Sequence, residues 1–312
     1  MDKQPFAHDL PHVIKDEVRD ALQQDRPVVA LESTLIAHGL PYPDNVATAL
    51  AIEAAVRAAK AVPATIAILS GRICIGLSDA QLEQLGSSSA FEKTNRAELP
   101  AYLSTKRSAA TTVSATIWLA HLAGIAFFAT GGIGGVHRGE SWDISADLTA
   151  LATTPMLVVC SGCKNILDFP RTFELLETLA IPVVGFQTQQ WPAFYLADSG
   201  IELSHFYSHI EDIAAFYRLH QQLHGHGMLV VQPPPFSTFS SEQFSRWLHS
   251  AEATARQQNI TGKAVTPFLL QQLHDLSGGL TLKVNQALAV ANAQLAAAVA
   301  VAHQNCTSEH SA

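Results

Sequence analysis

Six short apolar segments recur along the chain, separated by stretches with helical periodicity. They lie at 27–34, 64–71, 125–130, 155–162, 181–188 and 228–232. Most are nearly continuous runs of Val, Ile, Leu and Ala, a pattern typical of parallel strands covered on both faces. The sequence therefore predicts an α/β fold with three layers, α/β/α, around a mostly parallel central sheet. Helices are expected at about 11–24, 44–60, 78–85, 111–122, 170–179 and 210–223, and a helical C-terminal region at about 240–258, 265–276 and 282–303.

Composition limits the classes of function. Apolar residues make up 48% of the 312 residues and charged residues 15%, so a large core can form. The formal charge of −8 provides no basic surface for nucleic acid. The run 109–135 is apolar enough to suggest a membrane span, but its polar residues favour a buried helix followed by a buried strand. The polar start has no secretory signal, so a cytoplasmic protein without membrane or nucleic-acid partners is expected.

A glycine-rich loop follows the third apolar segment, within the stretch 127–148. It is not a dinucleotide fingerprint, because His137 stands where the third glycine would be needed. The cluster Asp143, Ser145 and Asp147 follows, and oxygen ligands at this spacing suit Mg²⁺ or Mn²⁺. A tight turn, a structural loop histidine and a helix cap are the alternative interpretations.

Two further polar residues follow apolar segments. Glu32 ends the first segment, and a carboxylate in apolar surroundings can serve as a general acid. Lys164 follows the fourth segment, is interpreted as the start of a helix, and has apolar neighbours, so its amine could form a Schiff base. A helix-cap partner is the alternative for Glu32, and a solvated lysine for Lys164. Ligands of parallel sheets bind beyond the carboxyl ends of strands, so one shared site is expected there.

Two other features are less informative from the residues alone. Lys93 lies in a charged stretch, FEKTNRAELP, that suggests an exposed loop. Cys160 and Cys163 form a CxxC without a second pair of ligand spacing, so buried structural thiols are favoured over a redox pair or a zinc site.

Motifs spread over nearly the whole chain resemble those of the pseudouridine-5′-phosphate glycosidase family, also called indigoidine synthase A-like. They are ALESTLIAHGLPYPDN at 30–45, TTV at 111–113, FATGGIGGVHRG at 128–139, DISADL at 143–148, VCSGCKNILD at 159–168, PVVGFQT at 182–188, TPFLL at 266–270 and LKVNQAL at 282–288. The resemblance implies a single α/β/α domain over 1–312 and typically a homotrimer. It also implies a pseudouridylate synthase, classed as a carbon–oxygen lyase. Such an enzyme reversibly cleaves the C–C glycosidic bond of pseudouridine 5′-phosphate to uracil and ribose 5-phosphate, with Mn²⁺ as the divalent metal, one per subunit.

The resemblance also implies roles for individual residues. Glu32 matches the proton donor, and Lys164 matches the lysine that bonds to ribose C1′ as a Schiff base. Asp143 matches the metal ligand. The residues implied to bind substrate are Lys93, Thr112, Val113, His137, the run Ser145, Ala146 and Asp147, and Asn285, with Asn285 near the uracil.

The chain departs from the family pattern at several positions. Ser108, Ala109 and Ala110 precede TTV where a glycine is usual, and QPPPFS at 232–237 replaces a segment with Asn and an acidic residue. Gln232 and Phe236 thus leave the nucleobase contacts open. Two alternatives remain: a Schiff-base lyase or aldolase for another sugar phosphate, and a non-catalytic sugar-phosphate-binding module.

Overall fold

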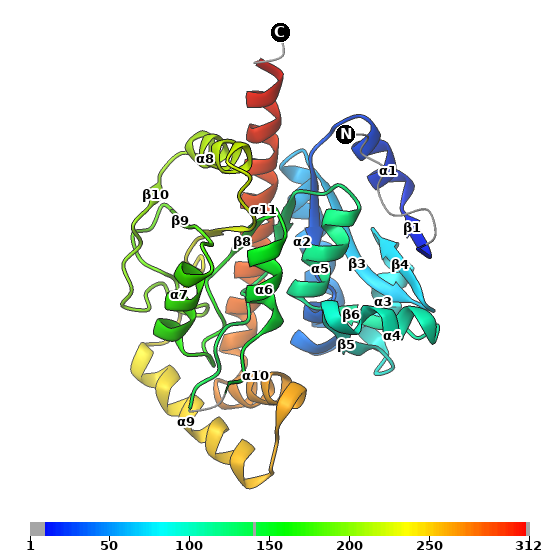
Figure 1. Ribbon diagram of the computed structural model, residues 1–312. Coiled ribbons are helices and arrows are strands. Elements are labelled where there is room, and N and C mark those ends of the chain that lie inside the picture. Colours follow the sequence, from blue (N-terminus) through cyan, green and yellow to red (C-terminus); the bar gives the residue numbers. More distant parts are fainter. Residues whose placement is uncertain (1–9, 140–141, 310–312) are drawn as a thin grey trace.

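A central 11-stranded sheet organises the protein, which is described here by a computed structural model covering residues 10–139 and 142–309 (Figure 1). Residues 1–9, the first half of the polar start in which no secretory signal is expected, lie outside the described residues. The strands are β1 (His12–Ile14), β2 (Val28–Leu31), β3 (Val62–Leu69), β4 (Arg72–Ile75), β5 (Glu92–Thr94), β6 (Ala109–Thr111), β7 (Phe127–Ala129), β8 (Leu157–Cys160), β9 (Val183–Phe186), β10 (Phe206–Tyr207) and β11 (Met228–Val231).

The sheet is mostly parallel, as the sequence predicts. Its main strand order is β1-β4-β3-β2-β7-β8-β11-β9-β10, and β5 and β6 join it through β3. Among the strands of the described residues, only the pairings of β3 with β4 and with β6 are antiparallel. All six predicted strands are present, and β2, β8 and β11 are buried along their whole length. The strands that the sequence missed are short or partly exposed and carry little periodic signal.

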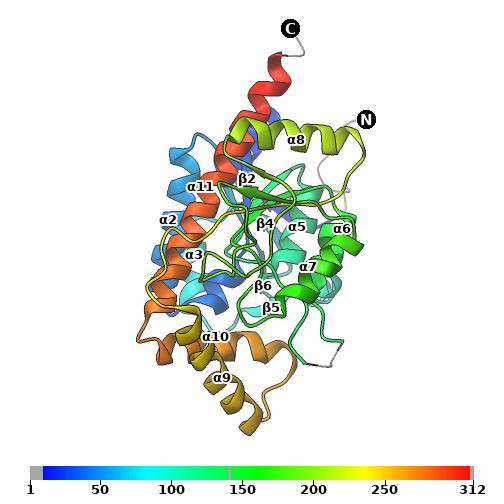
Figure 2. The ribbon, with the colours of Figure 1, turned by 90° about the vertical axis from the view of Figure 1, so that its left-hand side faces the viewer.

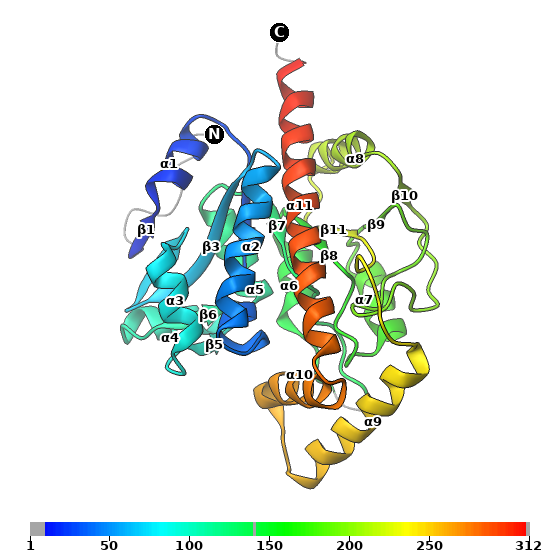
Figure 3. The same ribbon diagram turned by 180° about the vertical axis from the view of Figure 1, so that it is seen from behind.

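Helices cover both faces of the sheet, which confirms the three-layer prediction. Helices α5 (Val113–Leu122), α6 (Ala146–Thr153) and α7 (Phe169–Thr178) lie in front in Figure 1. Helices α2 (Asp44–Ala58), α3 (Asp79–Ser87) and α11 (Leu280–Glu309) lie in front in the reverse view of Figure 3. The remaining helices are α1 (Asp16–Gln23), α4 (Leu99–Ser104), α8 (Ile210–Gln222), α9 (Ser241–Gln257) and α10 (Val265–Leu276).

Local sequence explains several helix starts. Ser78 accepts a hydrogen bond from Gln81 N and forms a capping box at α3. Asp44 occupies the first turn of α2, where its negative charge lies at the positive end of the helix dipole. The predicted helix at 11–24 is only partly right, because its first residues form β1 beside β4. The single-domain assignment stays a prediction.

The long helix α11 runs across the back of the sheet between α2 and α8 (Figures 2 and 3). Within the described residues it is the one helix long and apolar enough to span a bilayer by length and composition, yet 61% of its apolar window is buried in the protein. A buried core helix has the same composition. Its Asn292 Nδ2 donates to Thr130 O at 2.9 Å, which ties α11 to the end of β7. The run 109–135 forms β6, α5 and β7, in agreement with the buried interpretation.

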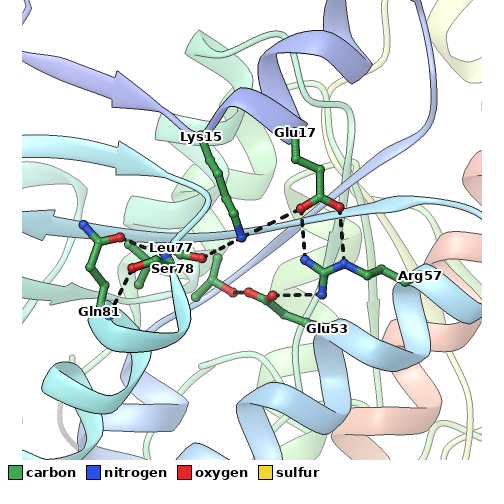
Figure 4. Close-up of polar contacts among 8 residues, drawn as sticks. Lys15, Glu17, Glu53, Arg57, Leu77, Ser78 and Gln81 are labelled. Atoms are coloured by element: carbon green, nitrogen blue, oxygen red, sulfur yellow. Dashed lines mark hydrogen bonds and ion pairs between the residues drawn. The ribbon is translucent and has the colours of Figure 1, made fainter.

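A charged network fastens α2 to its neighbours (Figure 4). Glu53 is only 2% exposed, and it accepts hydrogen bonds from Thr65 Oγ1 at 2.7 Å and from Arg57 at 3.2 Å. Arg57 also binds both oxygens of Glu17 on α1, at 3.1 and 3.2 Å. A buried carboxylate is tolerated only when it is paired in this way, so the network fixes α1 and α2 on β3.

The CxxC thiols are structural. Cys160 and Cys163 are fully buried and free, and burial raises the pKa of Cys160 to about 12 and that of Cys163 further. A thiol with so high a pKa is a poor nucleophile and metal ligand.

Candidate active site

The site lies where the winding of the sheet reverses. From β2 the chain crosses to β3 on one side, and it later returns to form β7 and then β8 on the other. Leu31, the last residue of β2, pairs with Ala129 of β7, which pairs with Val159 of β8. The segments that leave these strands therefore meet at one edge, and α/β proteins bind ligands at such a switch point.

Three adjoining pockets occupy this edge. The central pocket is lined by Glu32, Thr34, Leu35, His38, Gly39, Lys93, Gly131, Gly132, Lys164, Phe194, Thr266, Pro267, Leu270 and Asn285. The loop pocket, of ≈ 280 Å³, shares Glu32, Thr34, Lys93, Lys164 and Thr266 with it and extends over Thr112–Ser114, His137, Asp143 and Ser145–Asp147. The helical pocket, of ≈ 150 Å³, shares His38, Gly39, Pro267, Leu270 and Asn285 and extends along α10 and α11. Figure 1 shows α10 below the sheet at this end.

Glu32 follows β2 and is 9% exposed. Its two carboxylate oxygens accept short hydrogen bonds from the hydroxyls of Thr130 and Thr34. Thr34 Oγ1 also lies 3.2 Å from Thr111 O. The carboxylate is thus fixed by groups from β7 and its own turn, and it borders both the central and the loop pocket.

Lys164 is half-buried and borders the same two pockets. It lies after β8, as expected, but the prediction that it begins a helix is wrong, because α7 begins at Phe169 with Asp168 as its cap. Its N–H donates to Ile133 O at 3.2 Å. Arg138 donates to Leu167 O at 3.2 Å and to Asn165 O at 3.1 Å. The glycine-rich loop therefore holds the lysine-bearing turn in place.

Lys93 does not lie in an exposed loop. It is half-buried on β5, which pairs with β6, and it borders the central and loop pockets. The expectation of an exposed surface loop is therefore wrong. A strand of three residues with two charged members gave no apolar signal from which to predict it.

The glycines of this loop allow it to pack closely against neighbouring side chains, and they are not required for unusual backbone angles. None of Gly131, Gly132, Gly134 and Gly135 has positive φ. A Cβ on Gly132 would lie 2.6 Å from the ring of Phe194, and one on Gly134 would overlap Ser145 Oγ. Side chains at these two positions would clash with Phe194 and Ser145, so only glycine lets the loop pass this close to them.

Asp143, Ser145 and Asp147 do not form the expected cluster of three oxygen ligands. Asp147 is 6% exposed, and its carboxylate accepts from Ser114 N and from Gly134 N, both at 2.8 Å. Ser145 caps α6 by accepting from Asp147 N at 3.2 Å. Asp143 is exposed and has its side chain at the loop pocket. Within residues 10–139 and 142–309 no group of three or more His, Cys, Asp or Glu side chains could hold a metal.

The other predicted residues of the loop pocket surround two helix starts. Thr112 caps α5 and accepts from Ala115 N, and Val113 begins that helix. Ala146 begins α6, and His137 is half-buried and borders the same pocket. Helix N-termini and a lysine favour an anionic group. The pocket thus combines two lysines and two helix starts, which favour an anion, with four carboxylates, which favour a cation: Glu32, Glu98, Asp143 and Asp147.

Asn285 lies apart from the loop pocket. It is 4% exposed on α11 and borders the central and helical pockets. The departures Gln232 and Phe236 border none of the three pockets; Gln232 donates to Asn292 Oδ1 at 3.0 Å instead. These substitutions therefore lie outside the lining of the site.

Sequence reasoning missed several residues of the site. Thr34 and Thr130 hold Glu32, and His38 lines two pockets. Thr130 could have been found, because it follows the strand beside β2. His38 could not, because it lies in a five-residue π-helical turn, Leu35–Gly39, with no period of its own.

Together the fold and site define a class of α/β protein in which a carboxylate and two lysines meet in one small-molecule cavity at a switch point. The chain belongs to the family described as indigoidine synthase A like protein, whose model matches residues 17–302.

Similar proteins agree with this assignment. A pseudouridine-5′-phosphate glycosidase of Methylobacterium nodulans is 50% identical over 300 residues, which is 94% of this chain and 89% of that one. One of Caldanaerobacter subterraneus is 46% identical over 92% of this chain and 95% of its own. Among solved structures, the prealnumycin C-glycosynthase AlnA in complex with ribulose 5-phosphate has a TM-score of 0.87 at 35% identity, covering 96% of this chain and 99% of that one. An indigoidine synthase A-like protein from Thermotoga maritima has the same TM-score at 34% identity, covering 96% and 98%.

Proposed function

We propose that the protein is an enzyme that reversibly cleaves the C–C glycosidic bond of pseudouridine 5′-phosphate, giving uracil and ribose 5-phosphate. The observation that carries the proposal is the joint lining of the central pocket by Glu32 and Lys164, in a chain 50% identical to a pseudouridine-5′-phosphate glycosidase. A binding module has no need of an amine beside a carboxylate that two hydroxyls hold in place.

The chemistry requires both groups. Attack of the Lys164 amine on ribose C1′ breaks the C1′–O4′ bond, and Glu32 supplies the proton to O4′. The resulting open-chain amine can push electrons toward C1′. Glu32 then takes the proton that the lysine nitrogen loses and passes it to uracil C5. The C1′–C5 bond breaks with its electron pair passing to the base, and an iminium forms between C1′ and the lysine. Water then hydrolyses the iminium and releases ribose 5-phosphate.

The remaining groups of the loop pocket suit the sugar phosphate. The helix starts at Thr112–Val113 and at Ser145–Asp147 offer positive dipole ends, and Lys93 and His137 add donors. In this proposal the phosphate and ribose occupy the loop pocket, which leaves C1′ in the central pocket beside Lys164.

Asp143 is the proposed ligand of a divalent ion, Mn²⁺. Its exposed carboxylate at the loop pocket fits an ion that keeps most of its water, as small divalent ions do when one carboxylate and the substrate hold them. When bound, the ion would neutralise negative charge of the substrate. Asp147 is not proposed as a ligand, because its buried carboxylate already serves to hold two backbone N–H groups.

The first experiment is to incubate the protein and Mn²⁺ with pseudouridine 5′-phosphate and to follow uracil release. Release of uracil, and its consumption with ribose 5-phosphate in the reverse direction, is the expected result. A borohydride-trapped ribose 5-phosphate adduct without uracil release would instead identify a lyase or aldolase for another sugar phosphate. Neither signal would identify a binding module. The homotrimer and the cytoplasmic location stay predictions, and light scattering tests the first.

A further inference from the structure

The carboxyl ends of three adjoining strands meet at one buried side chain, Asn292 of α11. Strands β7, β8 and β11 are neighbours in the sheet, and the residues that directly follow them are Thr130, Ser161 and Gln232. All three form hydrogen bonds with the amide of Asn292, which is 0% exposed. A single side chain of the C-terminal helix therefore joins the ends of the strands from which the site is built.

The contacts of this amide fix its orientation. Its Nδ2 donates to Thr130 O at 2.9 Å and to Gly131 O at 3.3 Å, and its Oδ1 accepts from Gln232 Nε2 at 3.0 Å. Ser161 Oγ lies 3.3 Å from Oδ1 and 3.2 Å from Nδ2, and a hydroxyl can donate or accept. Gln232 and the two carbonyl groups therefore determine which way the amide points, because a flipped amide would place Oδ1 against two carbonyl oxygens.

The position of the amide is passed on to Lys164 through the glycine-rich loop. Three backbone hydrogen bonds, at 3.0, 3.1 and 3.2 Å, join this loop to the turn that carries the lysine. They run from Ser161 N to Gly131 O, from Ile133 N to Gly162 O and from Lys164 N to Ile133 O. The first of these acceptors, Gly131 O, also accepts from Asn292. A shift of the amide would therefore move the turn of Lys164.

The same amide acts on Glu32 through Thr130. The hydroxyl of Thr130 donates to the Glu32 carboxylate, and the carbonyl oxygen of Thr130 accepts from Asn292. Glu32 and Lys164 follow different strands and border one pocket, so their separation depends on how the strand ends are held. A misplacement of about 1 Å between reacting groups can lower a rate about 100-fold.

We propose that Asn292 is a positioning residue for the reaction and that Gln232 keeps its amide in the orientation that places Glu32 and Lys164 correctly. The inference rests on the proposed function, in which Lys164 attacks C1′ and Glu32 transfers the proton. Neither Asn292 nor Gln232 borders any of the three pockets, so both act on the geometry of the reacting groups and not on substrate binding. Gln232, a departure from the family pattern, thus acts on the site from outside its lining.

Two substitutions at Gln232 test the proposal. Gln232→Leu removes the donor to Asn292 and should lower kcat for uracil release about tenfold, with less than about a twofold change in the KM for pseudouridine 5′-phosphate. Gln232→Glu has the same shape but sets a carboxylate against Oδ1, so it should lower kcat about 100-fold. Asn292→Ala leaves buried carbonyl groups unpaired and disturbs folding as well, so the Gln232 variants decide the question.

Gln286→Leu is the matched control. Gln286 is half-buried on the same helix, donates from Nε2 to Thr48 Oγ1 of α2 at 3.1 Å, and borders none of the three pockets. Its substitution removes a similar hydrogen bond between distant elements, so it should lower Tm about as much as Gln232→Leu and leave kcat unchanged. A second measurement is the rate at which a borohydride-trapped ribose 5-phosphate adduct forms, which should fall in Gln232→Leu by the same factor as kcat.

The results that contradict the proposal are distinct. An unchanged kcat in both Gln232 variants would overturn it and leave the proposed function standing. An equal loss of kcat in Gln232→Leu and Gln286→Leu would also overturn it, because lost stability would then be the cause. A raised KM at unchanged kcat would show that Gln232 affects binding instead of positioning. If the wild-type enzyme releases no uracil, the proposed function is refuted, and this inference with it.

Discussion

Asp147→Asn should lower stability, whereas Asp143→Asn should change the metal dependence and leave stability nearly unchanged. Asp147 accepts two backbone N–H groups at 2.8 Å, from the start of α5 and from the glycine loop, and it is 6% exposed. An asparagine can accept one of them, while its NH₂ group faces the other N–H. One charge-assisted hydrogen bond is lost and one buried donor stays unpaired, which costs about 2–4 kcal/mol in the free energy of unfolding.

The assay is thermal unfolding of both variants beside a Mn²⁺ titration of activity. Asp147→Asn should lower Tm by about 3–6 °C, and saturating Mn²⁺ should not restore its activity. Asp143→Asn, at an exposed position, should change stability by less than about 0.5 kcal/mol but raise the Mn²⁺ concentration for half-maximal activity. The reasoning is refuted if Asp147→Asn is as stable as the wild type, or if both variants change the Mn²⁺ requirement alike.

Three further predictions follow from single contacts. Arg138→Ala frees the turn that carries Lys164 and should lower kcat about 10- to 100-fold with little change in stability; an unchanged kcat would contradict this positioning role. Thr130→Val removes one donor to Glu32 and should lower kcat about tenfold, while Thr178→Val on α7, whose hydroxyl bonds only within its own helix, should not. The hydrogen bond from Arg57 lowers the pKa of Glu17 below 4.5, so this stabilisation is present above pH 4.5 and lost as the pH falls through the lowered pKa. Glu17→Gln should therefore make unfolding less dependent on pH in that acid window, and an identical acid profile in denaturant melts would count against it.

Much of the fold could be predicted because buried parallel strands are nearly continuous runs of apolar residues, which are easily recognised in the sequence. Glu32 and Lys164 were found for the same reason, since each directly follows such a strand and the carboxyl ends of β2 and β8 meet at one edge. The reaction and the roles of individual residues could be predicted only from the resemblance of the motifs to a known family. Composition and spacing alone could not indicate them.

The rest depends on contacts between distant parts of the chain. Asp147 has the spacing of a metal ligand beside Asp143, yet Ser114 N and Gly134 N, remote in sequence, occupy its oxygens. The charged stretch around Lys93 predicts an exposed loop, but the pairing of β5 with β6 places Lys93 on a strand of the sheet. His38 can be recognised as a pocket residue only in the folded chain, where it borders the same pocket as Asn285 of α11. No local pattern encodes such neighbours.

The most direct test of the central claim is to locate the covalent adduct. Two lysines, Lys164 and Lys93, border the central pocket, and only one of them can attack C1′ in the proposed mechanism. The enzyme is incubated with ribose 5-phosphate, reduced with borohydride, digested and mapped by mass spectrometry. The account predicts the sugar phosphate on Lys164, with no adduct and no uracil release in Lys164→Ala. An adduct on Lys93, or uracil release by Lys164→Ala at the wild-type rate, would contradict it.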